Sequence, residues 1–155
     1  MRALWHLVYD WSTLLPTPFT DSPMFQPRPA ATPGFDSEEL GSTALTAFFN
    51  ITAAWGLSAE EERTLLGSPP RSTFFKWKSE RVAKLSPDTL ERISYVMGIY
   101  KALRILLPTQ EAAHAWVKKP NTAQGFAGKS ALERMLAGRV VDLADVRRYL
   151  DAERG

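Results

Sequence analysis

The chain has 155 residues, of which 45% are hydrophobic, so it can bury one domain-sized core or a core shared by two small helical lobes. It contains no cysteine and two histidines far apart in sequence, which excludes disulfides and thiol catalysis and argues against a metal site. No apolar run reaches the roughly 20 residues that a membrane crossing needs, so we expect a soluble, cytoplasmic protein.

Residues 1–36 predict a flexible, proline-rich arm. The stretch 16–35 contains six prolines and few residues that could pack, a composition typical of a linker. Met24 lies inside this stretch, and we hypothesise that translation begins there. The intact mass of the native protein tests that hypothesis.

From Ser37 onward the apolar residues recur at helical spacing, and no segment keeps a two-residue alternation, so the predicted fold class is all-α. The first expected helix ends near Gly56. The second runs over 58–66, with Ser58 and Glu61 in a capping-box arrangement and Gly67 as its stop. The apolar face of the first helix comprises Leu40, Ala44, Ala47, Phe48, Ile51 and Trp55.

A third helix is expected to start at "SPPRSTFFKWK", with Ser68 as its cap and Pro69 at its first position, where a missing N–H is harmless. We expect its aromatic residues, Phe74, Phe75 and Trp77, to be packing residues and not base-stacking ones. The longest helix starts at Ser86 and Pro87 and stops at Pro108.

Three shorter helices are expected in the last third of the chain. They span about 110–118, about 131–137 with Ser130 and Glu133 as a cap pair, and about 143–153 after Asp142. The expected organisation is a flexible arm (1–36), a helix-turn-helix bundle (37–107) and a small C-terminal helical domain (108–155).

Charge changes sign abruptly along the chain. Residues 37–70 carry five acidic groups and one basic group, whereas residues 71–84 carry five basic groups and one acidic group. Two short helices, a glycine break and a basic second helix are typical of a helix-turn-helix, whose second helix enters the major groove of DNA. Bundles that never touch DNA also contain such pairs, and the charges could be a solvated face. The candidate DNA-binding residues are Arg71, Ser72, Thr73, Lys76 and Lys78.

The sequence Gly128-Lys129-Ser130 looks like half of a phosphate-binding loop. That motif needs a glycine where Ala123 stands, and it needs a preceding strand where the pattern is helical. We therefore interpret Gly125 and Gly128 as a tight turn whose end is capped by Ser130.

Catalysis has little support in the sequence. His114 is expected to be a packed histidine, and the carboxylates of the last helix are explained by capping and by a solvated face. We predict no catalytic, cofactor-binding or metal-binding residue, and an enzyme is retained only as a remote alternative.

The stretch from Ala115 to Ala152 resembles the toxin-binding domain shared by Xre, MbcA and ParS antitoxins. The upstream stretch from Leu65 to Leu103 resembles the Xre-type helix-turn-helix that precedes this domain in the same family, and together the resemblance covers roughly residues 40–155. The positions that carry the C-terminal resemblance are Trp116, Pro120, Asn121, Gly128, Leu132, Met135, Leu136, Gly138 and Val146.

The resemblance implies an antitoxin of a type II toxin–antitoxin module, paired with a RES-domain toxin that consumes NAD. Such antitoxins form homodimers, obstruct the toxin's active site through the C-terminal domain, and repress their own operon by binding operator DNA through the N-terminal half. They are not enzymes, and NAD belongs to the partner. The alternative is a stand-alone helix-turn-helix regulator whose C-terminal half only dimerises.

Basic groups suit a partner that handles an anionic dinucleotide, and the last helix offers several beside an aromatic ring. We expect this helix and the 120–130 loop to occlude the toxin, although a solvated face is the alternative. We also expect that deleting residues 146–155 abolishes neutralisation and leaves the fold largely intact. The candidate toxin-binding residues are Trp116, Asn121, Lys129, Arg147, Arg148, Tyr149 and Arg154.

Overall fold

The computed structural model describes residues 37–155, so the expected arm over 1–36 and its Met24 lie outside the described residues. The described part consists of helices and connecting loops, and its only β-type pairing is an isolated bridge between Pro120 and Ser130, which confirms the all-α fold. The helices are α2 (Glu38–Ala54), α3 (Ala59–Leu65), α4 (Arg71–Glu80), α5 (Pro87–Leu106), α6 (Gln110–Trp116), α7 (Ala131–Met135) and α8 (Val140–Arg154).

Most helices begin where the sequence predicts, because a hydroxyl side chain accepts a hydrogen bond from a free backbone N–H of the first turn. Ser58 and Ser130 each form a complete capping box, with Glu61 and Glu133 reaching back to the cap residue. Ser86 caps α5, and Pro87 stands at its first position as predicted. Ser37 and Thr109 cap α2 and α6 in the same way.

The predicted start of α4 is wrong. Its cap residue is Pro70 and its first residue is Arg71, whereas we expected Ser68 and Pro69. A residue that precedes a proline is disfavoured in helical conformation, so Pro69 cannot open a helix in front of Pro70. Ser68 instead has a φ of 56° and completes the turn that ends α3, where its N–H donates to the Arg63 carbonyl at 2.9 Å.

The predicted start of α8 is also wrong. The cap position is Arg139 and the helix begins at Val140, so Asp142 is the third residue inside it. The Asp142 carboxylate reaches back and accepts from the Arg139 backbone N–H at 3.2 Å. The sequence signal for a cap was real, but it came from the acidic partner within the first turn.

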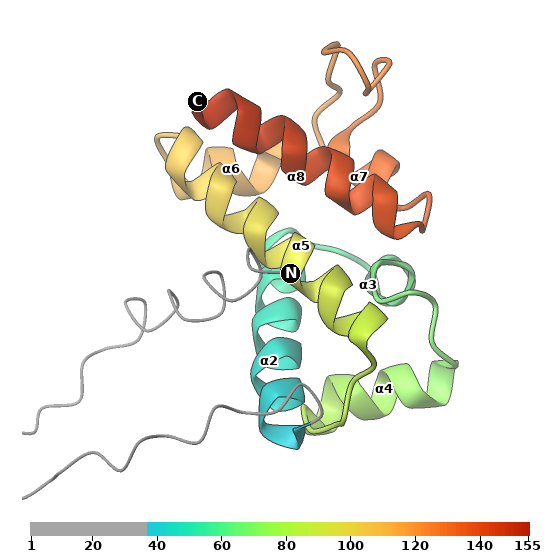
Figure 1. Ribbon diagram of the computed structural model, residues 1–155. Helices are drawn as coiled ribbons and strands as arrows, with labels where there is room; N and C mark the ends of the chain where they lie inside the picture. Colours follow the sequence, from blue (N-terminus) through green and yellow to red (C-terminus); the bar gives the residue numbers. More distant parts are fainter. Residues whose placement is uncertain (1–36) are drawn as a thin grey trace, which may run out of the picture.

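The core is continuous across the chain, and α5 is its central element. Figure 1 shows α5 running from the lower half, beside α2, to the upper half, beside α6 and α8. Phe48 of α2, Ile99 of α5 and Val146 of α8 are fully buried in this core. Because one helix supplies core residues to both halves, the two halves cannot separate without exposing apolar surface.

The aromatic residues of α4 differ in burial. Phe74 is fully buried and tilts against Phe49 with ring centroids 5.9 Å apart, and Trp77 is partly buried against the core. Phe75 is 45% exposed, so our prediction that it is a packing residue is wrong. A helix turns by about 100° per residue, so adjacent side chains cannot both point into the same core.

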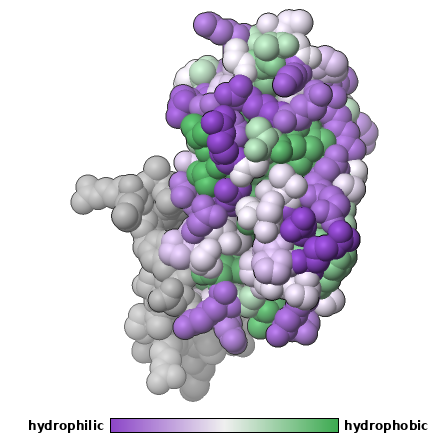
Figure 2. Space-filling view, turned by 90° about the vertical axis from the view of Figure 1, so that its right-hand side faces the viewer, coloured by the Kyte–Doolittle hydropathy of each residue, from purple (hydrophilic) through white to green (hydrophobic). Residues whose placement is uncertain are grey.

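Within residues 37–155, no helix combines the length and the apolar character that a membrane crossing requires. Figure 2 shows one face of the molecule, on which hydrophilic side chains cover much of the surface and hydrophobic ones form separate patches between them.

Candidate functional sites

The first candidate site is formed by α3 and α4, and a buried carboxylate joins the two helices. The Glu62 side chain is 4% exposed and forms an ion pair with Lys78 Nζ at 2.5 Å. Its other oxygen accepts from the Thr52 hydroxyl of α2 at 2.8 Å. A buried carboxylate needs such partners to avoid a large desolvation cost, so these contacts help to fix the angle between the two helices.

The five predicted DNA-binding residues all lie on α4, but their side chains differ in availability. Arg71 is well exposed and pairs with Glu60 at 3.1 Å, and Lys78 pairs with the buried Glu62. Ser72 and Lys76 are exposed, and Thr73 is half-buried. Lys76 forms no ion pair with any residue in 37–155. The acidic first turn of α3 therefore neutralises part of the charge that the sequence assigns to α4.

A surface groove runs along one side of α4. It separates this helix from the start of α2 and from the α4–α5 connection, so residues far apart in sequence face one another across it. The lining residues are Glu38, Ser72, Thr73, Lys76, Trp77, Glu80, Val82 and Ala83.

The second candidate site lies in the C-terminal part, where three aromatic rings pack together. Trp116 at the end of α6 stacks on Tyr149 of α8, with ring centroids 6.3 Å apart and planes at 14°. Phe126, from the loop that follows α6, contacts both rings edge-on, at 4.9 Å from Tyr149 and 6.3 Å from Trp116. Phe126 is 4% exposed, so it anchors the loop to the helices.

The loop over 120–130 is held by its own backbone. Asn121 exchanges hydrogen bonds with Gly128 and Lys129, and its side-chain oxygen accepts from the Ala123 N–H at 2.8 Å. Gly125 and Gly128 have φ values of 96° and 82°, which favour glycine. These contacts confirm a tight turn ending at the Ser130 cap, in place of a phosphate-binding loop. Figure 1 shows the loop projecting beyond α7 and α8. Lys129, near the end of the loop, is exposed.

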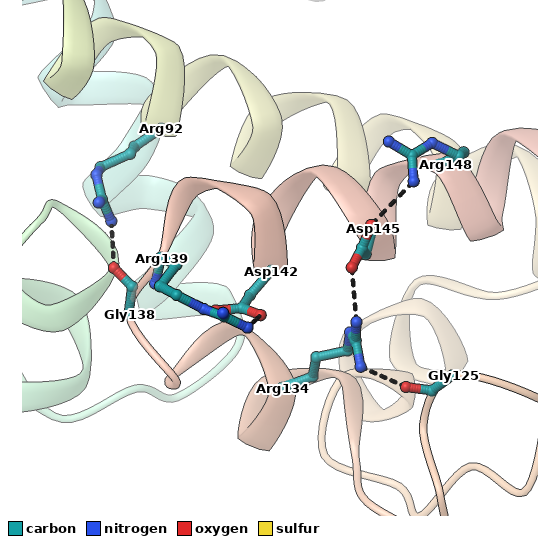
Figure 3. A network of polar contacts seen from close by, with 8 residues as sticks. All are labelled: Arg92, Gly125, Arg134, Gly138, Arg139, Asp142, Asp145 and Arg148. Carbon is teal, nitrogen blue, oxygen red and sulfur yellow. Dashed lines mark hydrogen bonds and ion pairs between the residues drawn. The ribbon is translucent and has the colours of Figure 1, made fainter.

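Arg134 of α7 connects this loop to α8, as Figure 3 shows. One guanidinium nitrogen donates to the Gly125 carbonyl, and another pairs with Asp145 at 2.6 Å. The second oxygen of Asp145 accepts from Arg148 at 2.9 Å. The loop is therefore tied to the folded core at its tip by Arg134 as well as at Phe126.

The predicted toxin-binding arginines fall into different environments. Arg147 is 16% exposed, lies over Gly98 of α5 and pairs with Asp151 at 2.9 Å. Arg148 is 75% exposed beside Asp145, and Arg154 is partly exposed near Asp151. Arg148, Arg154 and Lys129 thus reach the surface, whereas Arg147 covers the contact between α5 and α8.

The segment 146–155, which forms most of α8, contributes side chains to the core. Val146 and Leu150 are 0% and 2% exposed, so deleting residues 146–155 would remove core side chains. Our expectation that this deletion leaves the fold largely intact is therefore wrong. Removing buried aliphatic side chains costs about 2–5 kcal/mol each, so single surface substitutions are the better test.

Two carboxylates near this site have shifted pKa values. Hydrogen bonding to the Arg139 guanidinium holds the pKa of Asp142 below its usual value, against the opposing effect of burial. A hydrogen bond from the Ser130 backbone N–H holds the pKa of Glu133 below its usual value. Both groups are helix-capping acids, so these shifts belong to the fold and give no sign of catalytic tuning.

Sequence reasoning missed two residues that shape these sites, and it assigned a third to the wrong environment. Phe126 carried a weak signal, because it is the only large apolar residue in a glycine-rich loop. Arg134 carried none, since its partners lie 9 and 11 residues away on other segments. Phe75 was expected to pack like Phe74 and Trp77, because the sequence does not show which of three nearby aromatic residues faces the core.

Comparison with known proteins identifies both halves of the chain. Residues 35–98 match the antitoxin Xre-like helix-turn-helix domain, and residues 102–155 match the antitoxin Xre/MbcA/ParS C-terminal toxin-binding domain. The matched segments meet within α5. A relative from Sinorhizobium fredii (strain NBRC 101917 / NGR234), named "Uncharacterized protein y4oB", is 49% identical over 132 residues, which cover 85% of this chain and 99% of the relative. The chain therefore belongs to the Xre family of antitoxins, with a helix-turn-helix domain followed by a toxin-binding domain.

Proposed function

We propose that this antitoxin neutralises a cognate RES-domain toxin, an NAD-degrading enzyme, by obstructing its active site with the C-terminal domain. We further propose that it forms a homodimer and represses its own operon through α3 and α4. Catalysis and NAD both belong to the toxin in this scheme. The observation that carries the proposal is the presence of both matched domains in one chain, in this order.

The toxin-binding half supports obstruction because its exposed cations stand on a stiff support. Lys129 is exposed on a loop whose backbone is internally hydrogen-bonded. Arg148 stands on α8, where it pairs with Asp145 in the network of Figure 3. Guanidinium and ammonium groups pair strongly with carboxylates, so these cations suit acidic side chains of the toxin around the entrance to its active site. Because the loop is already ordered, little conformational entropy would be lost on binding, which favours affinity.

The helix-turn-helix half supports DNA binding through the exposed face of α4. Ser72 and Lys76 are available there, and a homodimer would place two such helices in successive major grooves. Because Arg71 and Lys78 are paired with α3, we expect fewer phosphate contacts than the sequence suggests. The affinity should therefore fall less steeply with salt than a count of five DNA-binding residues implies.

The decisive experiment is co-expression with the toxin encoded beside this gene, in a host whose growth and NAD content are measured. The wild-type antitoxin should restore both. Lys129→Glu combined with Arg148→Glu should weaken the complex by about tenfold or more, because the substitutions turn attraction to acidic toxin side chains into repulsion. Arg104→Glu, which reverses the charge of an exposed arginine on α5, serves as a control.

The outcomes separate the two functions. Failure of the wild-type chain to restore growth, while it still binds the DNA upstream of its gene, would favour the stand-alone regulator. Equal rescue by the charge-reversed chain and by the Arg104 control would place the toxin contact elsewhere.

A further inference from the structure

Phe75 is an exposed aromatic ring on the helix that the helix-turn-helix presents to DNA. It is 45% exposed, whereas its neighbour Phe74 is fully buried and meets it edge-on at 5.1 Å. Residues three or four apart share a face of a helix, so Phe75 stands between Ser72 and Ser79, both exposed, with Lys76 beside them. The Phe75 ring thus packs edge-on against a buried ring and lies exposed within an otherwise polar face.

An interface between copies of the chain fits this ring poorly. Stable interfaces bury about 800 Å² on each partner around an apolar centre. The other large exposed hydrophobic residues among those described are Val82, Ile105 and Val141. Val82 lies in the connection between α4 and α5, where it lines the groove. Ile105 and Val141 stand near the end of α5 and at the start of α8. Phe75 therefore has no apolar patch on its own helix to extend.

We propose that Phe75 reads sequence by contacting the 5-methyl group of a thymine in the major groove. This inference rests on the proposed binding of operator DNA by α4. Thymine alone among the bases presents a methyl group in that groove, and phenylalanine is one of the side chains suited to contact it.

The charges around α4 support this assignment. Lys78 is paired with the buried Glu62, and Arg71 forms an exposed ion pair with Glu60, so the two acidic groups reduce the positive charge that this helix offers to phosphate. Sequence discrimination then depends more on hydroxyl and apolar contacts to base edges, which Ser72, Ser79 and Phe75 supply together. The edge-on contact with buried Phe74 limits the freedom of the Phe75 ring, so binding loses little side-chain entropy.

The test uses the full chain and the DNA immediately upstream of its own gene. Footprinting defines the protected segment, and synthetic duplexes then replace each of its thymines, one at a time, by deoxyuridine. Deoxyuridine pairs as thymine does but lacks the methyl group. We expect one position in each half-site to lose about fourfold in affinity, as the burial of one methyl group implies.

The variants assign that loss to one side chain. Phe75→Ala should bind the thymine and uracil duplexes equally at the sensitive position. Phe75→Gln, which keeps more of the side-chain stem over Phe74, should give the same result if the alanine variant folds poorly. Val141→Ala removes an equally exposed apolar side chain from α8 and should keep the wild-type preference for thymine.

Each alternative outcome overturns the inference in a recognisable way. If the chain protects no DNA, both the proposed repression and the thymine contact fail. If it protects DNA but every uracil duplex binds as well as its thymine counterpart, only the thymine contact fails. If both Phe75 variants convert a dimer to a monomer in light scattering, the ring belongs to an interface between copies.

Discussion

Arg92 of α5 donates a hydrogen bond from Nη1 to the carbonyl oxygen of Gly138 at 2.9 Å, across 46 positions of sequence (Figure 3). Its Nε pairs with Asp88 at 3.0 Å, and its side chain is 11% exposed. A Cβ on Gly67, in the turn between α3 and α4, would lie 3.0 Å from the same Nε. One guanidinium thus contacts the turn of the helix-turn-helix and the turn before α8.

Replacing this arginine should loosen both turns. We expect Arg92→Leu to lower the free energy of unfolding by about 1.5–3 kcal/mol, because the Gly138 carbonyl loses a charged donor at a largely buried position. Urea unfolding followed by circular dichroism measures the change. Arg104→Leu on the exposed face of α5 is the control, and an equal, small loss in the two variants would contradict a role for Arg92 in joining the turns.

The two lysines of α4 should behave differently although both are predicted to bind DNA. Lys78→Ala leaves the buried Glu62 carboxylate without its cation, so stability should fall by about 1–3 kcal/mol. Lys76→Ala should leave stability within about 0.5 kcal/mol of the wild type and weaken DNA binding. Thermal unfolding and DNA affinity are measured on both variants. Equal stability of the two would show that the contact between Lys78 and Glu62 contributes nothing.

Acid should destabilise the protein partly through Asp142. Its pKa is lowered in the folded chain, so its contribution is present above the unfolded pKa of about 4 and is lost as the pH falls through the lower, folded pKa. Asp142→Asn should therefore lower the free energy of unfolding at pH 7 and have a smaller effect near pH 2.5. Urea midpoints at the two pH values measure this, with Glu153→Gln as the control for loss of one negative charge. A decrease of the same size at both pH values would be inconsistent with it.

The loop over 120–130 should depend on Arg134 for its rigidity. Arg134→Gln removes the charged contacts to the Gly125 carbonyl and to Asp145, so amide hydrogens at Gly128 and Lys129 should exchange faster while global stability changes little. Toxin affinity should fall because the loop must then be ordered on binding.

Arg148→Gln is the matched control for that experiment. It also removes a partner of Asp145, but Arg148 makes no contact with the loop carbonyl that Arg134 binds. Its amide exchange in the loop should match the wild type. Faster exchange in both variants would assign the effect to Asp145 and not to the hydrogen bond between Arg134 and the Gly125 carbonyl.

The predictions that came from local chemistry were confirmed where the whole interaction lies within one short stretch of sequence. The capping boxes at Ser58 and Ser130, the proline start of α5 and the glycine turn before Ser130 need only residues a few positions apart. The starts of α4 and α8 were wrong because the local rule was incomplete: a second proline restricts the first, and an acidic residue can cap from inside the helix.

By itself, the sequence determined the all-α fold, the order of its helices and the family, because hydrophobic period, caps and motif spacing are all properties of neighbouring residues. Only the tertiary structure decided which charged and aromatic groups are available. Lys78 and Arg147 are engaged inside the fold, whereas Phe75 is exposed. Those assignments depend on contacts between helices distant in sequence, and no local pattern encodes which side chain a neighbouring helix will cover.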